Sequence, residues 1–156
     1  MDTTWATNLQ RHAMNYMSGK FFIDTNVLVY AHDRTSGIKY QKARSLAQEL
    51  WEGENAVIST QVLQELYAAL RRRANFPLSP DEAEQVLRDY FEWEIVVNTR
   101  ESILRAVALE IRYKISFWDA LILQAAETAE AEIVYTEDLS HGQAYGPVTV
   151  INPFAA

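Results

Sequence analysis

Short apolar runs of three or four residues alternate with segments of helical length along most of this chain. A strand buried on both faces appears in sequence as a continuous apolar run, and parallel strands need long crossovers that are usually helical. The pattern therefore predicts an α/β fold, with a central, mostly parallel β-sheet flanked by α-helices. The apolar runs are Phe21–Ile23, Ala56–Ile58, Ile95–Val97, Ile133–Tyr135 and Val148–Ile151.

Capping residues mark where the intervening helices begin. Ser79, Pro80 and Glu82 supply an N-cap, a first-turn proline and the third-position acid of a capping box. The same reasoning predicts helices after Ser59 or Thr60 to about residue 74, after Thr99 to about Tyr113, and after Ser116 to about Glu130. Two earlier helices are expected over Asn26–Ala31 and Lys39–Trp51.

Length and composition indicate one globular domain. The chain has 156 residues, of which 49% are hydrophobic and 22% charged. The polar segment 1–16 has no clear period, so we treat it as an N-terminal extension and residues 17–156 as a single domain. Without cysteine there is no disulfide, thiolate zinc site or cysteine nucleophile. We expect a cytoplasmic protein without a membrane partner, since no apolar run reaches about 18 residues.

Carboxylates recur where strands end or helices begin. Asp24 follows the first strand, and Glu137 and Asp138 follow the strand at 133–135. Asp119 falls in the first turn of the helix after Ser116, and Glu65 in the second turn of the helix after Ser59. Ligands of open α/β sheets bind at the carboxyl ends of the strands. Oxygen ligands gathered there would suit Mg²⁺ or Mn²⁺.

Each carboxylate also has a structural alternative. Asp24 suits a helix cap, Asp119 suits a capping box with Ser116, and Asp138 suits a solvated loop. Glu65 points away from the apolar stripe of its helix, so position alone favours an ordinary exposed glutamate. The net charge of −7 is the wrong sign for a typical nucleic-acid binder, unless clustered carboxylates bind divalent cations and invert the local field.

Four segments resemble the motifs of the PIN-domain family, in order along the chain. They are FIDTNVLVY at 22–30, STQVLQEL at 59–66, SFWDALI at 116–122 and YTEDLSHGQ at 135–143. The resemblance runs from Lys20 to about Pro153 and is specifically to VapC-type toxin ribonucleases. It implies a sheet flanked by helices, a divalent-metal site, cleavage of single-stranded RNA and an antitoxin protein as partner.

The chemistry of such a site gives each residue an expected role. Asp24 and Asp119 are the principal metal ligands, and Asp138 binds directly or through water. Glu65 is an outer ligand or orients the attacking water. A second group of residues would hold these ligands in place by hydrogen bonds. They are Thr25, Asn26, Ser116, Thr136 and Glu137. Ser116 and Thr136 serve equally well as helix caps.

Contacts to RNA are expected from cations near the site. Arg72 shares a helix face with Glu65, seven residues away, although a cation at a helix C-terminus has its own structural reason. Arg34 and Lys39 belong to a second basic group. For Trp118, packing in the core is favoured over stacking on a base, since its helix is apolar nearly all round. His141 is more readily explained as a solvated loop residue than as a general acid.

Two other functions compete with the metal-dependent ribonuclease. A phosphatase of the haloacid-dehalogenase type needs a second aspartate two residues after the first, where this chain has Asn26. A non-catalytic PIN-like module that binds RNA or protein is the main alternative, and the presence of all four acidic positions argues against it.

We also expect a homodimer. The segments 39–51 and 80–93 contain more aromatic surface than a small core needs, and we place the interface there. The aromatic residues concerned are Tyr40, Trp51, Tyr90, Phe91 and Trp93.

Overall fold

A computed structural model describes residues 19–73 and 75–155, so the segment 1–16 lies outside the described residues. Six strands form one sheet in the order β3-β2-β1-β4-β6-β5. All neighbours are parallel except the last pair, β6 and β5. The predicted α/β architecture is thereby confirmed. The strands are β1 Lys20–Ile23, β2 Ala56–Ser59, β3 Glu94–Val96, β4 Ala131–Tyr135, β5 Ala144–Tyr145 and β6 Val148–Ile151.

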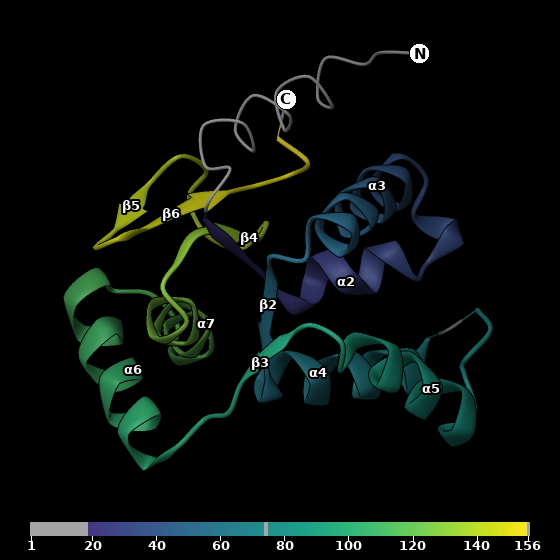
Figure 1. Cartoon of the computed structure of the whole chain (residues 1–156), viewed down its shortest axis with the longest axis horizontal. Coiled ribbons are helices and arrows are strands. Elements are labelled where there is room, and N and C mark those ends of the chain that lie inside the picture. The colour runs from purple at the N-terminus through teal and green to yellow at the C-terminus, as the bar shows by residue number, and fades with distance from the viewer. Residues whose placement is uncertain (1–18, 74, 156) are drawn as a thin grey trace.

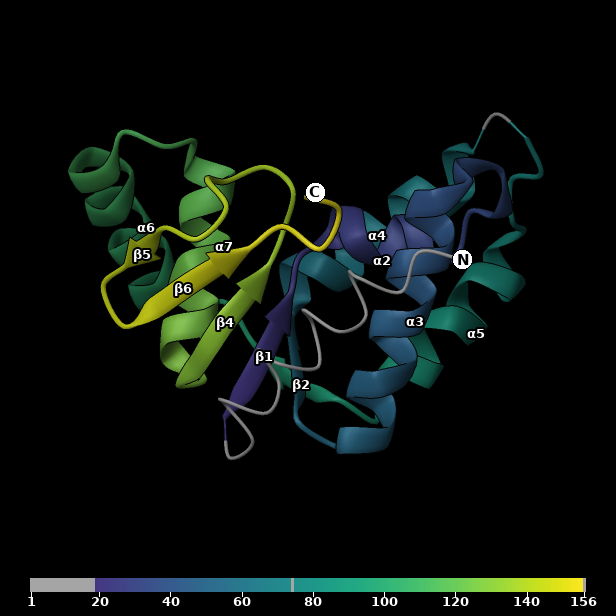
Figure 2. The same ribbon diagram turned by 90° about the horizontal axis from the view of Figure 1, so that it is seen from above.

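Helices cover both sides of this sheet (Figures 1 and 2). One side carries α6 and α7, and the other carries α2, α3, α4 and α5. The helices are α2 Thr25–Ala31, α3 Ile38–Gly53, α4 Thr60–Arg72, α5 Pro80–Tyr90, α6 Arg100–Tyr113 and α7 Phe117–Thr128. In the described ranges, no helix is long and apolar enough to cross a membrane.

The predicted helix starts agree with the structure. Ser59, Thr99 and Ser116 each cap a helix, and Ser79 forms a complete capping box with Glu82. Two short elements were not predicted: a 3₁₀ turn at Arg34–Ser36 and the two-residue strand β5. Neither is long enough to show a hydrophobic period.

The core lies between the sheet and its helices, and it fixes the carboxyl edge of the sheet. The central strands β1, β2 and β4 are almost wholly buried. Helix α7 buries seven consecutive residues, Ala120–Ala126, beneath that sheet. Each large apolar side chain contributes about 1.5–3 kcal/mol when fully buried. The core therefore holds the ends of β1 and β4 in place, together with α7 from Ala120 onward.

Candidate metal centre

Asp24 is buried at the carboxyl end of β1, with only 5% of its surface exposed. Its Oδ1 accepts the Thr25 N–H at 2.7 Å, so it does cap α2, and its Oδ2 accepts the Thr136 hydroxyl at 2.8 Å. Burial raises the pKa of Asp24 to about 7, and the charges of Asp138 and Glu65 add smaller contributions in the same direction. The capping alternative is thus true, but it does not account for a carboxylate buried among other acids.

Thr136 and Asn26 connect Asp24 to Asp138. The Thr136 hydroxyl donates to Asp24 and accepts the Asp138 N–H at 3.1 Å. Asn26 Nδ2 donates to Asp138 Oδ2 at 2.8 Å and to Thr136 Oγ1 at 3.4 Å. Thr136 is fully buried, whereas Asp138 is exposed at the rim. These two polar residues therefore fix how the two carboxylates face each other.

Asp119 reaches the same place from the first turn of α7. Ser116 Oγ accepts the Asp119 N–H at 3.1 Å, and the Asp119 side chain is partly buried. Partial burial raises the pKa of Asp119, and the charges of Asp138 and Glu65 act in the same direction. One ligand oxygen from each of Asp24, Asp119 and Asp138 lies within 4.8 Å of the others.

Glu65 borders this group and is held by two donors. Its Oε2 accepts the Thr25 hydroxyl at 2.9 Å, and its Oε1 accepts Gln61 Nε2 at 2.8 Å. Gln61 is buried and also donates to the Trp118 carbonyl at 3.3 Å, so it links α4 to α7. The sequence analysis missed Gln61. Its spacing of four residues before Glu65 on one helix face was the available signal.

The donor set suits a hard divalent cation. Three carboxylates at this spacing provide only oxygen ligands, which Mg²⁺ and Mn²⁺ prefer. Two further oxygens, Asn26 Oδ1 and Gln61 Oε1, are buried without a hydrogen-bonding partner in the described part of the chain. A cation and its hydration shell would satisfy acceptors of this kind, so the residues present fit the ion that the sequence analysis predicted.

Glu137 and His141, two other residues considered for the site, form hydrogen bonds outside the acidic cluster. Both oxygens of Glu137 are bonded, one to the Tyr30 hydroxyl and the other to the Lys39 ammonium, each at 2.8 Å. Lys39 is therefore paired with Glu137 within the chain. His141 Nδ1 accepts the Asn152 N–H at 2.9 Å on the exposed loop, and His141 does not belong to the group of residues that could hold the ion.

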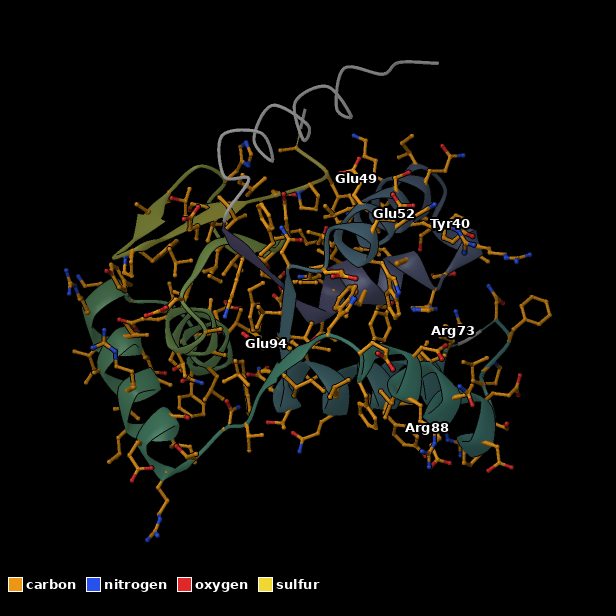
Figure 3. The ribbon with its side chains drawn as sticks, viewed as in Figure 1. Tyr40, Glu49, Glu52, Arg73, Arg88 and Glu94 are labelled. Carbon is orange, nitrogen blue, oxygen red and sulfur yellow. The ribbon has the colours of Figure 1, made fainter. Side chains whose placement is uncertain are left out.

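An open groove runs from the acidic cluster along α4. It has a volume of about 570 Å³, and its walls include Asp24, Glu65, Ala68, Arg72 and Asp138. Arg72 brings a cation into this groove. Neighbouring Arg73 instead turns to donate to the His32 carbonyl (Figure 3). Arg34 is exposed in the short 3₁₀ turn and does not line the groove.

Trp118 lies beside the acidic cluster and contradicts the expectation of core packing. It is 63% exposed, although the helix that follows it is buried. The first turn of α7 is only partly covered and burial begins at Ala120, so the apolar sequence of the helix does not imply burial at Trp118.

A mostly parallel sheet with helices on both faces and an acidic cluster at its carboxyl edge defines an α/β protein with a candidate metal site. Comparison with family models is more specific, because the model for the PIN domain matches residues 21–146. The chain belongs to the PIN-domain family. Among curated proteins, no sequence matches it significantly.

Solved structures with the same fold include three that concern toxin–antitoxin systems. A toxin–antitoxin complex from Klebsiella pneumoniae is 20% identical with a TM-score of 0.64, and the alignment covers 88% of this chain and all of that one. VapC20 of Mycobacterium tuberculosis, a toxin that cleaves the sarcin–ricin loop, is 19% identical with a TM-score of 0.60, covering 76% and 90%. VapBC2 from Rickettsia felis, bound to a promoter DNA fragment, is 20% identical with a TM-score of 0.54, covering 83% and 96%.

Proposed function

We propose that this chain is a Mg²⁺- or Mn²⁺-dependent endoribonuclease that cuts single-stranded RNA. The observation that carries the proposal is the convergence of Asp24, Asp119 and Asp138 within 4.8 Å at the carboxyl edge of a PIN-family fold. Hydrolysis of a phosphodiester needs an activated water and neutralisation of charge on the phosphate, and a bound divalent ion supplies both.

The residues around the cluster have separate tasks in this proposal. Asp24, Asp119 and Asp138 would hold the ion, while Thr136 and Asn26 keep two of these carboxylates in place. Glu65, clamped by Thr25 and Gln61, would orient the water and receive its proton. The water oxygen then bonds to phosphorus as the bond to the leaving ribose oxygen breaks.

We further propose that the enzyme is the toxin of a toxin–antitoxin pair and acts in the cytoplasm, where its RNA would be found. Two of the structures with this fold are toxin–antitoxin complexes, which supports an antitoxin as partner. An arginine of that partner would neutralise the acidic cluster effectively, because a guanidinium pairs with carboxylates through two hydrogen bonds.

Cleavage of a labelled single-stranded RNA tests the enzymatic proposal. Activity should disappear in a chelator and return with Mg²⁺ or Mn²⁺, whereas Ca²⁺ should support little turnover. Activity that persists fully in the chelator contradicts the metal mechanism. RNA binding without cleavage under every metal would favour the non-catalytic module instead.

For the homodimer, the exposed apolar surface favours α6 over the segments 39–51 and 80–93. Tyr90 and Trp93 are buried inside the chain, which removes much of the aromatic surface expected there. Helix α6 exposes four large apolar side chains between 39% and 71%, enough to suggest a covered face. They are Ile103, Leu104, Val107 and Ile111.

The sequence of α6 is also complementary to itself. If two copies cross antiparallel about a two-fold axis between Val107 and Ala108, Leu104 faces the partner's Ile111. Glu101 then faces the partner's Lys114, and all these side chains are exposed. A two-fold interface uses the same patch on both subunits. We propose that a second copy of this chain covers α6.

Sedimentation distinguishes the two candidate interfaces. The double variant Leu104→Glu, Ile111→Glu should be monomeric at micromolar concentration, while Phe91→Glu should remain dimeric. A dimer lost only in Phe91→Glu would place the interface on α5, and a monomeric parent would contradict the homodimer.

A further inference from the structure

The exposed ring of Trp118 is the largest apolar side chain beside the acidic cluster. Its neighbour Asp119 belongs to that cluster, and its carbonyl accepts Gln61 Nε2, the same amide group that binds Glu65. The ring also meets Phe117 edge to face, with centroids 5.5 Å apart. Trp118 is therefore anchored at the site but leaves 63% of its surface in solvent, and the core does not need it.

Arg72 marks the other end of the groove. Gln61, Glu65, Ala68 and Arg72 share one face of α4, and Glu65 and Arg72 are separated by about 10 Å along the axis. Between them, Ala68 and Ala69 leave room over the helix. Arg72 Nε donates to the Ala68 carbonyl at 3.2 Å. In the ranges 19–73 and 75–155, no carboxylate forms an ion pair with Arg72.

The groove thus has carboxylates at one end and Arg72 at the other, and the exposed ring of Trp118 adjoins Asp119 of the same acidic cluster. Aromatic rings bind single strands because any unpaired base can stack on them, whereas the bases of a duplex are stacked on one another. A guanidinium binds phosphate without regard to sequence. The Trp118 ring and the Arg72 guanidinium therefore suit different parts of the same nucleotide chain, a base and a phosphate.

We propose that an unpaired strand lies along α4, with one base stacked on Trp118 and a phosphate on Arg72, so that the phosphate between them faces the acidic cluster. The inference rests on the proposed function, and it identifies the substrate of that site as RNA with an unpaired base next to the scissile phosphate. Trp118 and Arg72 are binding residues in this account. Neither is assigned a proton transfer or a metal.

Abasic scanning of a short RNA tests the stacking contact directly. Binding is measured in the Asp24→Asn background with Mg²⁺, so that the RNA is not cut, and one base at a time is removed from the strand. With Trp118 present, one position should weaken binding about 10- to 100-fold when its base is missing. With Trp118→Ala, intact RNA should bind more weakly by a similar factor, and that position should no longer matter. Trp118→Phe should preserve most of the effect.

Substitution of Arg72 should affect RNA binding differently from substitution of Trp118. Arg72→Gln should weaken all strands about equally and lower the salt dependence by about one phosphate contact. Phe91→Ala, which removes an exposed aromatic at the C-cap of α5 and outside the groove, is the matched control and should change nothing.

Cleavage of the same RNA by the parent protein separates the two proposals. If the parent cuts the RNA but no abasic position depends on Trp118, the stacking contact is wrong and the proposed function stands. If the parent neither cuts nor binds single-stranded RNA, both are wrong.

Discussion

Two hollows of about 570 Å³ open at opposite ends of the same sheet, and they differ in how far their charged side chains are buried. At the carboxyl edge, Asp24 is 5% exposed and faces two other carboxylates. At the amino edge, Glu94 (labelled in Figure 3) pairs with Lys20 at 2.8 Å, with both side chains nearly half exposed. Trp51 and Trp93 line the hollow beside this pair. Burial of a carboxylate without a cation is unfavourable, so only the carboxyl edge retains an arrangement that stability alone does not explain.

Replacing Asp24 should have the largest effect on function. Asp24→Asn preserves the cap on α2, because asparagine caps helices as well as aspartate does. It removes the buried charge that would hold the ion, so RNA cleavage should fall by about 1000-fold or more. Glu94→Gln, at the opposite edge, is the matched control and should cut at the parental rate. Comparable losses in both variants would remove the distinction between the edges.

Removing the Gln61 amide should have an intermediate effect. Gln61→Leu frees one oxygen of Glu65, and cleavage should fall about 10- to 100-fold, as for other residues that orient a catalytic group. Metal affinity should fall much less than cleavage, because Asp24, Asp119 and Asp138 are untouched and only the Gln61 oxygen near the ion is lost. Gln61→Glu should not restore the rate, since it places a second acid against Glu65. Metal affinity that falls as much as cleavage would mean that Gln61 acts on the cluster as a whole.

The buried acid should also make the metal-free protein sensitive to pH. The pKa of Asp24 is about 7 in the fold, above its ordinary 3.8, so the folded state binds a proton more tightly than the unfolded state. Stability from this group is therefore complete below pH 4 and declines as pH rises toward 7. Between pH 5 and pH 8, the parent should lose about 2–3 kcal/mol more than Asp24→Asn in denaturant unfolding with chelator. Parallel pH curves for the two proteins would refute the raised pKa.

The ion pair at the amino edge should matter least. Glu94→Gln should lower the free energy of unfolding by at most about 1 kcal/mol, because exposed pairs are screened by water and salt. The loss should shrink further in 1 M salt. A loss above about 2 kcal/mol that salt does not reduce would show that this edge, too, stores a constrained charge.

The sequence predicted the carboxyl edge well because its features are local. Each buried strand reads as an apolar run, and parallel strands end at one edge, so the acids after β1 and β4 had to converge there. This convergence predicted that Asp24 and Asp138 would meet, whereas Asp119 follows no strand and was grouped with them through its resemblance to a PIN-domain motif. Their role as metal ligands stays a prediction.

What the sequence did not predict depends on distant partners. The pairing of Lys39 with Glu137, 98 residues away, was not predicted, and the contact of Lys39 with RNA stays a prediction. Trp118 was expected in the core, but it is 63% exposed in the partly covered first turn of α7. Neither a period nor a capping rule specifies which side chains from separate elements meet, or where a helix leaves the cover of the sheet.

Thermal melting with and without metal tests the central claim most directly, when the parent and Asp24→Asn are compared beside an RNA cleavage assay. A cation that binds only the folded state stabilises it by about 2.7 kcal/mol at one hundred times its dissociation constant. The parent should gain Tm with Mg²⁺ or Mn²⁺ and cut RNA. Without metal, Asp24→Asn should be as stable as the parent or more stable, by about 0.5–2 kcal/mol in the free energy of unfolding. It should gain less Tm from added metal, and it should not cut RNA. A variant that melts lower, responds to metal like the parent and still cuts RNA would contradict the assignment of Asp24 and the metal centre built on it.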